Sequence, residues 1–165
     1  MKRLAAAVGL ALLLAACRPD AKGDADNLAQ SKAFLAANAT AAGVTALPSG
    51  LQYKVVRSGP ATGLRPQLSD EVKVNYEGKL VSGQVFDSSY ARGVPASMPL
   101  SGLIPAWREA LQLMRPGDEW ILYVPPQLGY GSEGAGGGEI PPDSALIFRI
   151  ELIGVLPGPG RNALG

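Results

Sequence analysis

The sequence predicts a single α+β domain, in which several antiparallel strands surround one short helix. Two observations carry this prediction. Residues 100–118 form a strongly amphipathic helical segment, and segments with the alternating pattern of strands lie on both sides of it. Because a lone helix among strands must bury its apolar stripe against a sheet, we expect this helix to pack at the centre of the fold.

The helical segment has one apolar stripe, and its members are Ile104, Trp107, Leu111 and Met114. Pro105 suits the first helical position, because its missing N–H would have no partner there, and Pro116-Gly117 ends the segment. Leu113 falls outside the stripe. Taken alone, Trp107 is best interpreted as a core residue.

Strand-like patterns recur along the rest of the chain. We expect strands over residues 51–56, 72–77, 85–86, 119–124 and 145–155. Residues 90–99 are expected to form a loop, and residues 129–142 a glycine-rich loop. These segments define a folded domain over residues 49–157, followed by a flexible tail at residues 158–165.

The composition excludes several classes of catalyst. The chain has 165 residues, of which 47% are hydrophobic, with no histidine and one cysteine, Cys17. Ser-His-Asp and Cys-His catalysis, zinc sites built from His or Cys, and a disulfide-stapled core are therefore excluded. We expect no metal and no cofactor.

The first residues have the features of a secretory leader. Lys2 and Arg3 precede the apolar residues 4–16, a stretch shorter than the ~20 residues that a spanning helix needs. The leader ends in Leu14-Ala15-Ala16-Cys17, which resembles the bacterial lipobox, whose cysteine is lipidated. The alternative is an ordinary signal peptide with an incidental cysteine.

We expect residues 1–16 to be a lipoprotein signal peptide and Cys17 to be acylated, so that the protein is held on a membrane surface. Arg18 follows the cysteine, where an Asp would act as an inner-membrane retention signal in enteric bacteria. By resemblance to that sorting rule, we expect the outer membrane, on the side that faces the periplasm. Residues 17–48 would then be a lipidated N-terminus and spacer, with a modest helix over residues 24–38.

The charge balance excludes nucleic acid as a partner. The chain has 15 Lys and Arg against 14 Asp and Glu, and loss of the leader removes two basic residues, Lys2 and Arg3. No basic stripe remains.

Two local motifs have ordinary interpretations beside functional ones. The segment GSEGAGGG at residues 131–138 lacks the G-K-[ST] ending of a phosphate-binding loop, and a flexible loop over a site is the better interpretation. Asp87 would by default cap a turn.

Five segments in order, VNYEG, VFDSS, IPAW, LGYG and IPPDSALIFRIEL, resemble the FKBP-type peptidyl-prolyl cis-trans isomerases. The match covers residues 72–155. Upstream, FLAANATAAGVTALPSGLQYKVV is similar to bacterial members related to macrophage infectivity potentiators. The resemblance implies an FKBP-like half-open, twisted antiparallel sheet wrapped around one short helix, with the ligand pocket between them.

The resemblance also implies the site residues. Those with catalytic roles are Tyr76, Phe86, Asp87, Trp107 and Tyr130, and those that bind substrate are Arg92, Leu103, Ile104, Ile140 and Phe148. Trp107 becomes the pocket floor. The Tyr130 O–H and the Ile140 backbone N–H would hold substrate carbonyls, and Asp87 would orient Tyr76 or interact with the twisting amide.

The implied function is isomerisation of X-Pro bonds in envelope proteins; the alternative is a non-catalytic chaperone or binding module for proline-containing segments. Tacrolimus or rapamycin binding follows from the resemblance alone, and Ala96, where eukaryotic members often carry a pocket phenylalanine, weakens it. Ala106 and Asp143 are further departures from the eukaryotic pattern. The chain lacks the long helical dimerisation region of the macrophage infectivity potentiators, so we expect a monomer.

Overall fold

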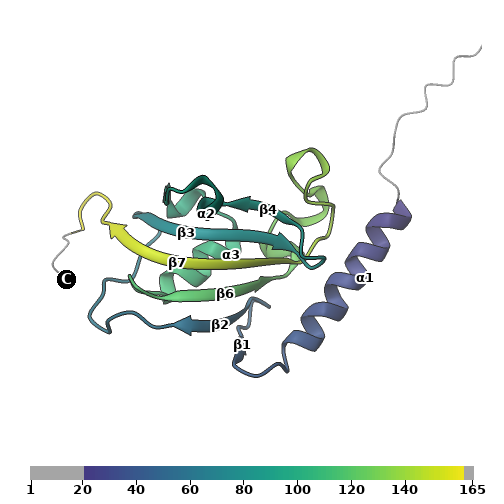
Figure 1. The fold of residues 1–165 in the computed structure, drawn as a ribbon, viewed down its shortest axis with the longest axis horizontal. Coiled ribbons are helices and arrows are strands. Elements are labelled where there is room, and N and C mark those ends of the chain that lie inside the picture. The colour runs from purple at the N-terminus through teal and green to yellow at the C-terminus, as the bar shows by residue number, and fades with distance from the viewer. Residues whose placement is uncertain (1–20, 162–165) are drawn as a thin grey trace, which may run out of the picture.

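The computed structural model describes residues 21–161 as one antiparallel sheet with a short helix packed in its curve (Figure 1). The predicted signal peptide and Cys17 lie outside the described residues. The helices and strands, in chain order, are α1 (Ala21–Asn38), β1 (Val44–Ala46), β2 (Gln52–Arg57), β3 (Glu71–Leu80), β4 (Val85–Ser88), α2 (Ser89–Arg92), β5 (Ala96–Pro99), α3 (Pro105–Leu113), β6 (Glu119–Val124) and β7 (Leu146–Leu156). Short 3₁₀ turns lie at Leu100–Gly102, Pro126–Leu128, Gly131–Glu133 and Gly136–Gly138.

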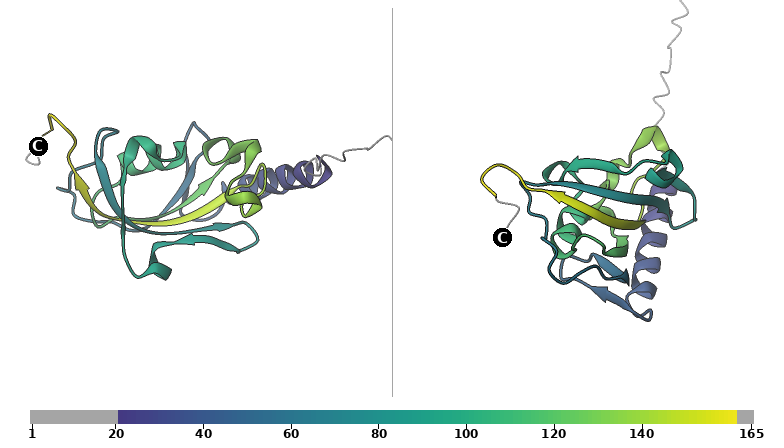
Figure 2. Two further views of the ribbon diagram at one scale, coloured as in Figure 1. Left: turned by 90° about the horizontal axis from the view of Figure 1, so that it is seen from above. Right: turned by 60° about the vertical axis from the view of Figure 1, so that its left-hand side comes forward.

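The strands form one seven-stranded sheet, in which six strands follow the order β1-β2-β6-β7-β3-β4. The seventh strand, β5, pairs with β3 at a different part of that strand from β4. Neighbouring strands are antiparallel. The long strands β3 and β7 lie side by side at the centre and curve over α3 (Figure 2). The predicted α+β class, with a half-open twisted sheet around one short helix, is confirmed.

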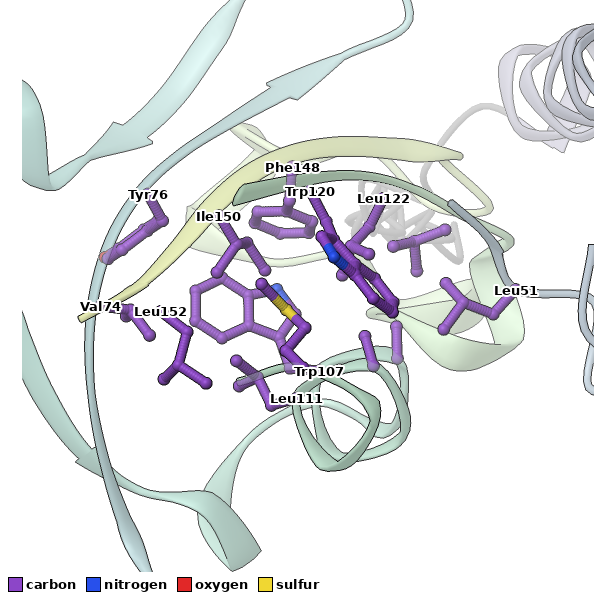
Figure 3. Packing of buried hydrophobic residues seen from close by; sticks show 14 of the residues in the cluster. Leu51, Val74, Tyr76, Trp107, Leu111, Trp120, Leu122, Phe148, Ile150 and Leu152 are labelled. Carbon is purple, nitrogen blue, oxygen red and sulfur yellow. The ribbon is translucent and has the colours of Figure 1, made fainter. Parts of the chain in front are cut away.

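Helix α3 packs its apolar face under the sheet. Pro105 is its first residue, as predicted, and its buried residues include Trp107 and Leu111 (Figure 3). Ile104 and Met114 cap the two ends of the helix and extend the same stripe beyond it. Buried side chains of β3, β6 and β7 complete this core, among them Val74, Leu122, Phe148, Ile150 and Leu152.

The structure differs from the sequence prediction at residues 90–99, where it has a short helix and a strand instead of a loop. In α2, the Ser88 side chain accepts a hydrogen bond from the Ala91 N–H, and Gly93 ends the helix with a left-handed φ of 70°. β5 pairs with residues Glu71 to Val74 of β3. Both elements have four residues, which is too short for a period to show in the sequence.

The segment before the domain is helical and folds back onto the sheet. The expected helix over residues 24–38 is present and begins three residues earlier, at Ala21. It crosses one end of the sheet (Figure 1), where Gln52 Nε2 donates a hydrogen bond to the Leu35 carbonyl oxygen (2.9 Å) and Phe34 packs on Tyr123. β1 then extends the sheet at a point before residue 49, where we expected the domain to start.

The start of the expected tail is tied to the domain. The fully buried Asp70 carboxylate accepts hydrogen bonds from the Gly158 N–H (2.9 Å), from the Gln67 N–H (2.8 Å) and from the Arg161 guanidinium. Arg161 also donates to the Arg65 carbonyl oxygen (2.7 Å). Residues 158–161, the first part of the predicted tail, are therefore tied to the domain, and residues 162–165 lie outside the described residues.

Candidate active site

A pocket of about 540 Å³ opens between α3, the sheet and the glycine-rich loop. Its lining residues come from six separate segments and are mostly apolar. They are Tyr76, Phe86, Asp87, Met98, Gly102, Leu103, Ile104, Trp107, Tyr130, Ala135, Gly136, Glu139, Ile140 and Phe148. Nine of the ten predicted site residues are therefore brought together here; Arg92 is the exception.

Trp107 forms the floor of the pocket, with only 4% of its surface exposed. Its ring packs edge-to-face against Tyr76 (centroids 5.1 Å apart) and Phe148 (5.3 Å). Its indole Nε1 is buried and has no hydrogen-bond acceptor among the described residues. Trp107 therefore belongs both to the hydrophobic core and to the pocket lining.

Phe86 and Phe148 form one wall, with their rings edge-to-face at 5.6 Å. Gly78 of β3 lies beneath both rings: a Cβ at this position would come within 2.6 Å of each. Because contacts this short are excluded, only a glycine lets the two rings approach β3 so closely. Gly78 is the last residue of the VNYEG segment, which explains why that motif ends in glycine.

Three polar groups are joined at the pocket rim. The Tyr76 hydroxyl and the Arg92 guanidinium both donate hydrogen bonds to Asp87, and Arg92 Nη2 also donates to the Tyr76 oxygen (3.0 Å). The network links β3, β4 and α2. Arg92, which we expected to bind substrate, is not among the lining residues and instead holds Tyr76 and Asp87.

This network sets the protonation of its members. Burial alone would raise the pKa of Asp87, but the hydrogen bonds from Tyr76 and Arg92 and the guanidinium charge outweigh burial and lower it. Burial, followed by the hydrogen bond to Asp87, raises the pKa of Tyr76. Asp87 is therefore a carboxylate and Tyr76 a neutral phenol at neutral pH, and neither is poised to transfer a proton.

The glycine-rich loop forms the remaining wall and carries Tyr130 and Ile140. The Ile140 N–H donates to the Ala135 carbonyl oxygen (3.0 Å), and the Ala135 N–H donates to the Ile140 carbonyl oxygen (2.9 Å). The Ile140 N–H, which we expected to hold a substrate carbonyl, is thus already used within the loop. The Ile104 N–H, at the start of α3, donates to no acceptor among the described residues and belongs to a pocket residue.

The Tyr130 side chain is 37% exposed at the pocket, and its hydroxyl has no hydrogen-bond partner among the described residues. Burial, and then the negative charge of Asp87, raises the pKa of Tyr130. Its hydroxyl therefore stays protonated at neutral pH and is available as a donor.

Sequence reasoning missed five lining residues: Met98, Gly102, Ala135, Gly136 and Glu139. Met98 lies on β5, which was not predicted, and the others lie in turns without a regular period.

The described residues contain no group of acidic side chains that could hold a metal ion. Among the helices in residues 21–161, none is both long and apolar enough to cross a membrane.

Comparison with known proteins confirms the resemblance. Residues 63–153 match the family described as FKBP-type peptidyl-prolyl cis-trans isomerase, and residues 14–55 match the domain amino-terminal to that isomerase. The peptidyl-prolyl cis-trans isomerase Mip of Coxiella burnetii is 55% identical over 129 residues, which are 78% of this chain and 55% of that protein. The outer membrane protein MIP of Legionella longbeachae is 48% identical over 130 residues, 79% of this chain and 54% of that protein.

Solved structures of similar proteins have the same fold. The crystal structure of FkpA from Escherichia coli has a TM-score of 0.78 at 44% identity and covers 84% of this chain and 63% of its own. A peptidyl-prolyl cis-trans isomerase from Pseudomonas syringae pv. tomato has a TM-score of 0.74 at 35% identity, covering 81% of this chain and 96% of its own. The chain spans just over half the length of the two curated relatives. With more than half of its residues matched, the chain belongs to the family of FKBP-type peptidyl-prolyl cis-trans isomerases.

Proposed function

We propose that this protein catalyses cis–trans isomerisation of X-Pro peptide bonds in the pocket between α3 and the sheet. The observation that carries the proposal is the aromatic floor and wall, in which Trp107 packs edge-to-face on Tyr76 and Phe148. Membership of the isomerase family supports it. The pocket walls suit a proline ring, which is compact, apolar and free of an N–H donor.

The reaction needs neither a nucleophile nor an acid–base pair, because rotation about the amide breaks no covalent bond. The barrier of ~18–20 kcal/mol comes from resonance, which places positive charge on nitrogen and negative charge on oxygen. The planar ground state is more polar than the twisted transition state, so an apolar pocket destabilises it relative to the twisted form. The two isomers of an X-Pro bond differ by only ~0.5–1 kcal/mol, so each is accessible as product.

Two donors would hold the peptide while the amide turns. They are the Tyr130 hydroxyl and the Ile104 N–H, both at the pocket and both without an acceptor among the described residues. Asp87 would act through its fixed negative charge next to the rotating carbonyl and through its hold on Tyr76. Phe86 and Trp107 would grip the ring of the proline.

The test is isomerisation of short X-Pro peptides by residues 18–165, compared with Phe86→Ala, Asp87→Ala and Trp107→Ala and with folding checked by circular dichroism. Each folded variant should lose about tenfold or more in kcat/KM, which corresponds to about 1.4 kcal/mol. Val56→Ala, an exposed position away from the pocket, is the matched control and should keep full activity. A folded wild-type chain that binds proline peptides without accelerating isomerisation would establish the binding module instead.

We also propose that the protein is a lipid-anchored monomer of the outer membrane, facing the periplasm, that assists the folding of envelope proteins. The leader sequence and Cys17 support the anchor, and the packing of α1 on its own domain supports a monomer. Cys17→Ser should release the protein from the membrane fraction and abolish labelling by palmitate. Sedimentation should give the mass of one chain, and a dimer would contradict the proposal.

Macrolide inhibitors such as tacrolimus or rapamycin would occupy the same pocket. Ala96 and Met98 lie on β5 at this side of the domain, and Met98 lines the pocket. We expect Ala96→Phe to strengthen tacrolimus binding, measured by calorimetry, because the larger ring adds apolar surface. Unchanged binding would show that Ala96 does not limit the affinity.

A further inference from the structure

Helix α1 makes its most buried polar contact with the turn that follows Ile140. Only 2% of Ser31 is exposed, and its Oγ donates to the Asp143 carbonyl oxygen (2.8 Å) while it accepts from the Ala145 N–H (2.7 Å). The Ala145 N–H is buried and has no other acceptor among the described residues. One hydroxyl on the helix therefore pairs two backbone groups of the turn.

Asn27, one helical turn earlier, makes the second contact. Its Nδ2 donates to the Pro142 carbonyl oxygen and to Ser144 Oγ (3.0 Å), and Ser144 Oγ in turn donates to the Pro141 carbonyl oxygen (2.7 Å). Residues four apart lie on the same face of a helix, so Asn27 and Ser31 together cover residues 141–145.

The same turn is tied to the pocket wall on its other side. The Asp143 N–H donates to the Gly131 carbonyl oxygen (2.8 Å), next to Tyr130, and Asp143 has a φ of 55°, which few non-glycine residues adopt. The loop it closes is tight, because a Cβ at Gly134 would lie 2.2 Å from the Ile140 carbonyl oxygen. A shift of the turn would therefore move the Tyr130 and Ile140 wall.

We propose that Ser31, assisted by Asn27, is a positioning residue for the proposed isomerase site: it fixes the turn at residues 141–145 and thereby the Tyr130–Ile140 wall of the pocket. This inference rests on the proposed function. It assigns to the segment before the domain a part in shaping the site, beyond that of a spacer.

The other anchor of α1 separates this role from general stabilisation. Gln52 Nε2 donates a hydrogen bond to the Leu35 carbonyl oxygen (2.9 Å), and Gln52 Oε1 accepts one from Asn38 Nδ2 (2.8 Å). Both bonds lie at the end of the helix away from the turn. If α1 acted only by adding stability, loss of the Gln52 anchor and loss of the Ser31 anchor would have the same effect on activity. If Ser31 positions the wall, only its loss should lower activity.

The experiment compares Ser31→Ala, Asn27→Ala, Ser31→Thr, Gln52→Ala and Lys32→Ala in the chain from residue 18 to 165. The measurements are kcat and KM on an X-Pro peptide well below the melting temperature, and amide hydrogen exchange. Lys32, next to Ser31, is exposed and is the helix-surface control. Asn27→Ala removes a half-buried side chain and keeps the test valid if Ser31→Ala does not fold.

We expect Ser31→Ala and Asn27→Ala to lower kcat/KM by about threefold to tenfold, the range that loss of one hydrogen bond supplies. The amides of Ala135 and Ile140 should exchange faster, while those of β3 and β7 are unchanged. Ser31→Thr, which keeps the hydroxyl, should restore activity, and Gln52→Ala and Lys32→Ala should retain it.

Unchanged kcat/KM in folded Ser31→Ala and Asn27→Ala, or an equal loss in Gln52→Ala, would overturn the proposal. An inactive wild-type chain would overturn the proposed function instead, and the exchange data would then decide on the positioning of the loop: unaltered exchange at Ala135 and Ile140 would refute it.

Discussion

The Tyr76 hydroxyl donates a hydrogen bond to Asp87 and so joins β3 to β4 at the rim of the aromatic pocket. Arg92, from α2, donates to both partners. These three side chains, from three elements, thus form a closed hydrogen-bond network at the rim of the pocket.

Arg92→Leu should lower activity more than stability. The side chains of Arg92 and Asp87 are 47% and 42% exposed, so water screens their ion pair and its loss should change the free energy of unfolding little. Tyr76 and Asp87 would lose their common donor, and kcat/KM should fall several-fold. Arg92→Lys keeps the charge but not the planar fork of donors, so it should restore activity only in part. Urea unfolding and peptide isomerisation measure the two effects; a large loss of stability with full activity would contradict this assignment.

Activity should be flat with pH across the neutral range. The pKa of Asp87 is lowered below its ordinary value of 3.8, so the folded state binds this proton less readily than the unfolded chain. Its contribution to stability is complete above the ordinary pKa and is lost as the pH falls through the lowered, folded pKa. The pKa of Tyr130 is raised above its ordinary value of 10.0, so its donor is lost only in strong alkali.

The measurement is a pH profile of kcat/KM for the wild type and for Asp87→Asn. The Asn variant should lack the acid limb of the profile. Because the chain has no histidine, a transition between about pH 6 and 8 would show that a group outside this network controls the reaction.

Gly78→Ala should damage both stability and activity. The new methyl group would lie 2.6 Å from the rings of Phe86 and Phe148, and overpacking of this kind costs about 1–3 kcal/mol. The displaced rings would also change the pocket wall, so kcat/KM should fall. Gly154→Ala is the matched control, because it is also in a central strand but has open space around the added Cβ. Equal effects of the two substitutions would show that strand flexibility, and not the ring contact, is the cause.

Arg161→Met should destabilise the protein without affecting the pocket. The substitution leaves the buried Asp70 carboxylate with two backbone N–H donors and no counter-charge, and we expect a loss of up to about 3 kcal/mol. Thermal unfolding would measure it, with the isomerase activity of the folded protein unchanged. An unaltered melting temperature would show that residues 158–161 do not hold the domain together in solution.

The sequence by itself determined the fold class and most of the pocket. The apolar stripe through Trp107 and Leu111 required α3 to be covered, and the alternating strands could only cover it as a sheet. The aromatic residues of the pocket lie in short motifs, and the order and spacing of these motifs can be read directly from the sequence. Nine of the ten site residues expected from these motifs line one pocket.

Only the tertiary structure decided which partner each polar group takes. Arg92 pairs with Asp87 instead of lining the pocket, the Ile140 N–H is used by Ala135, and Ser31 reaches a turn more than a hundred residues away. The physical reason is the separation along the chain between the groups that interact. Periodicity follows from the contacts of a residue with one nearby surface, whereas a hydrogen bond between distant segments depends on where the whole sheet brings them together.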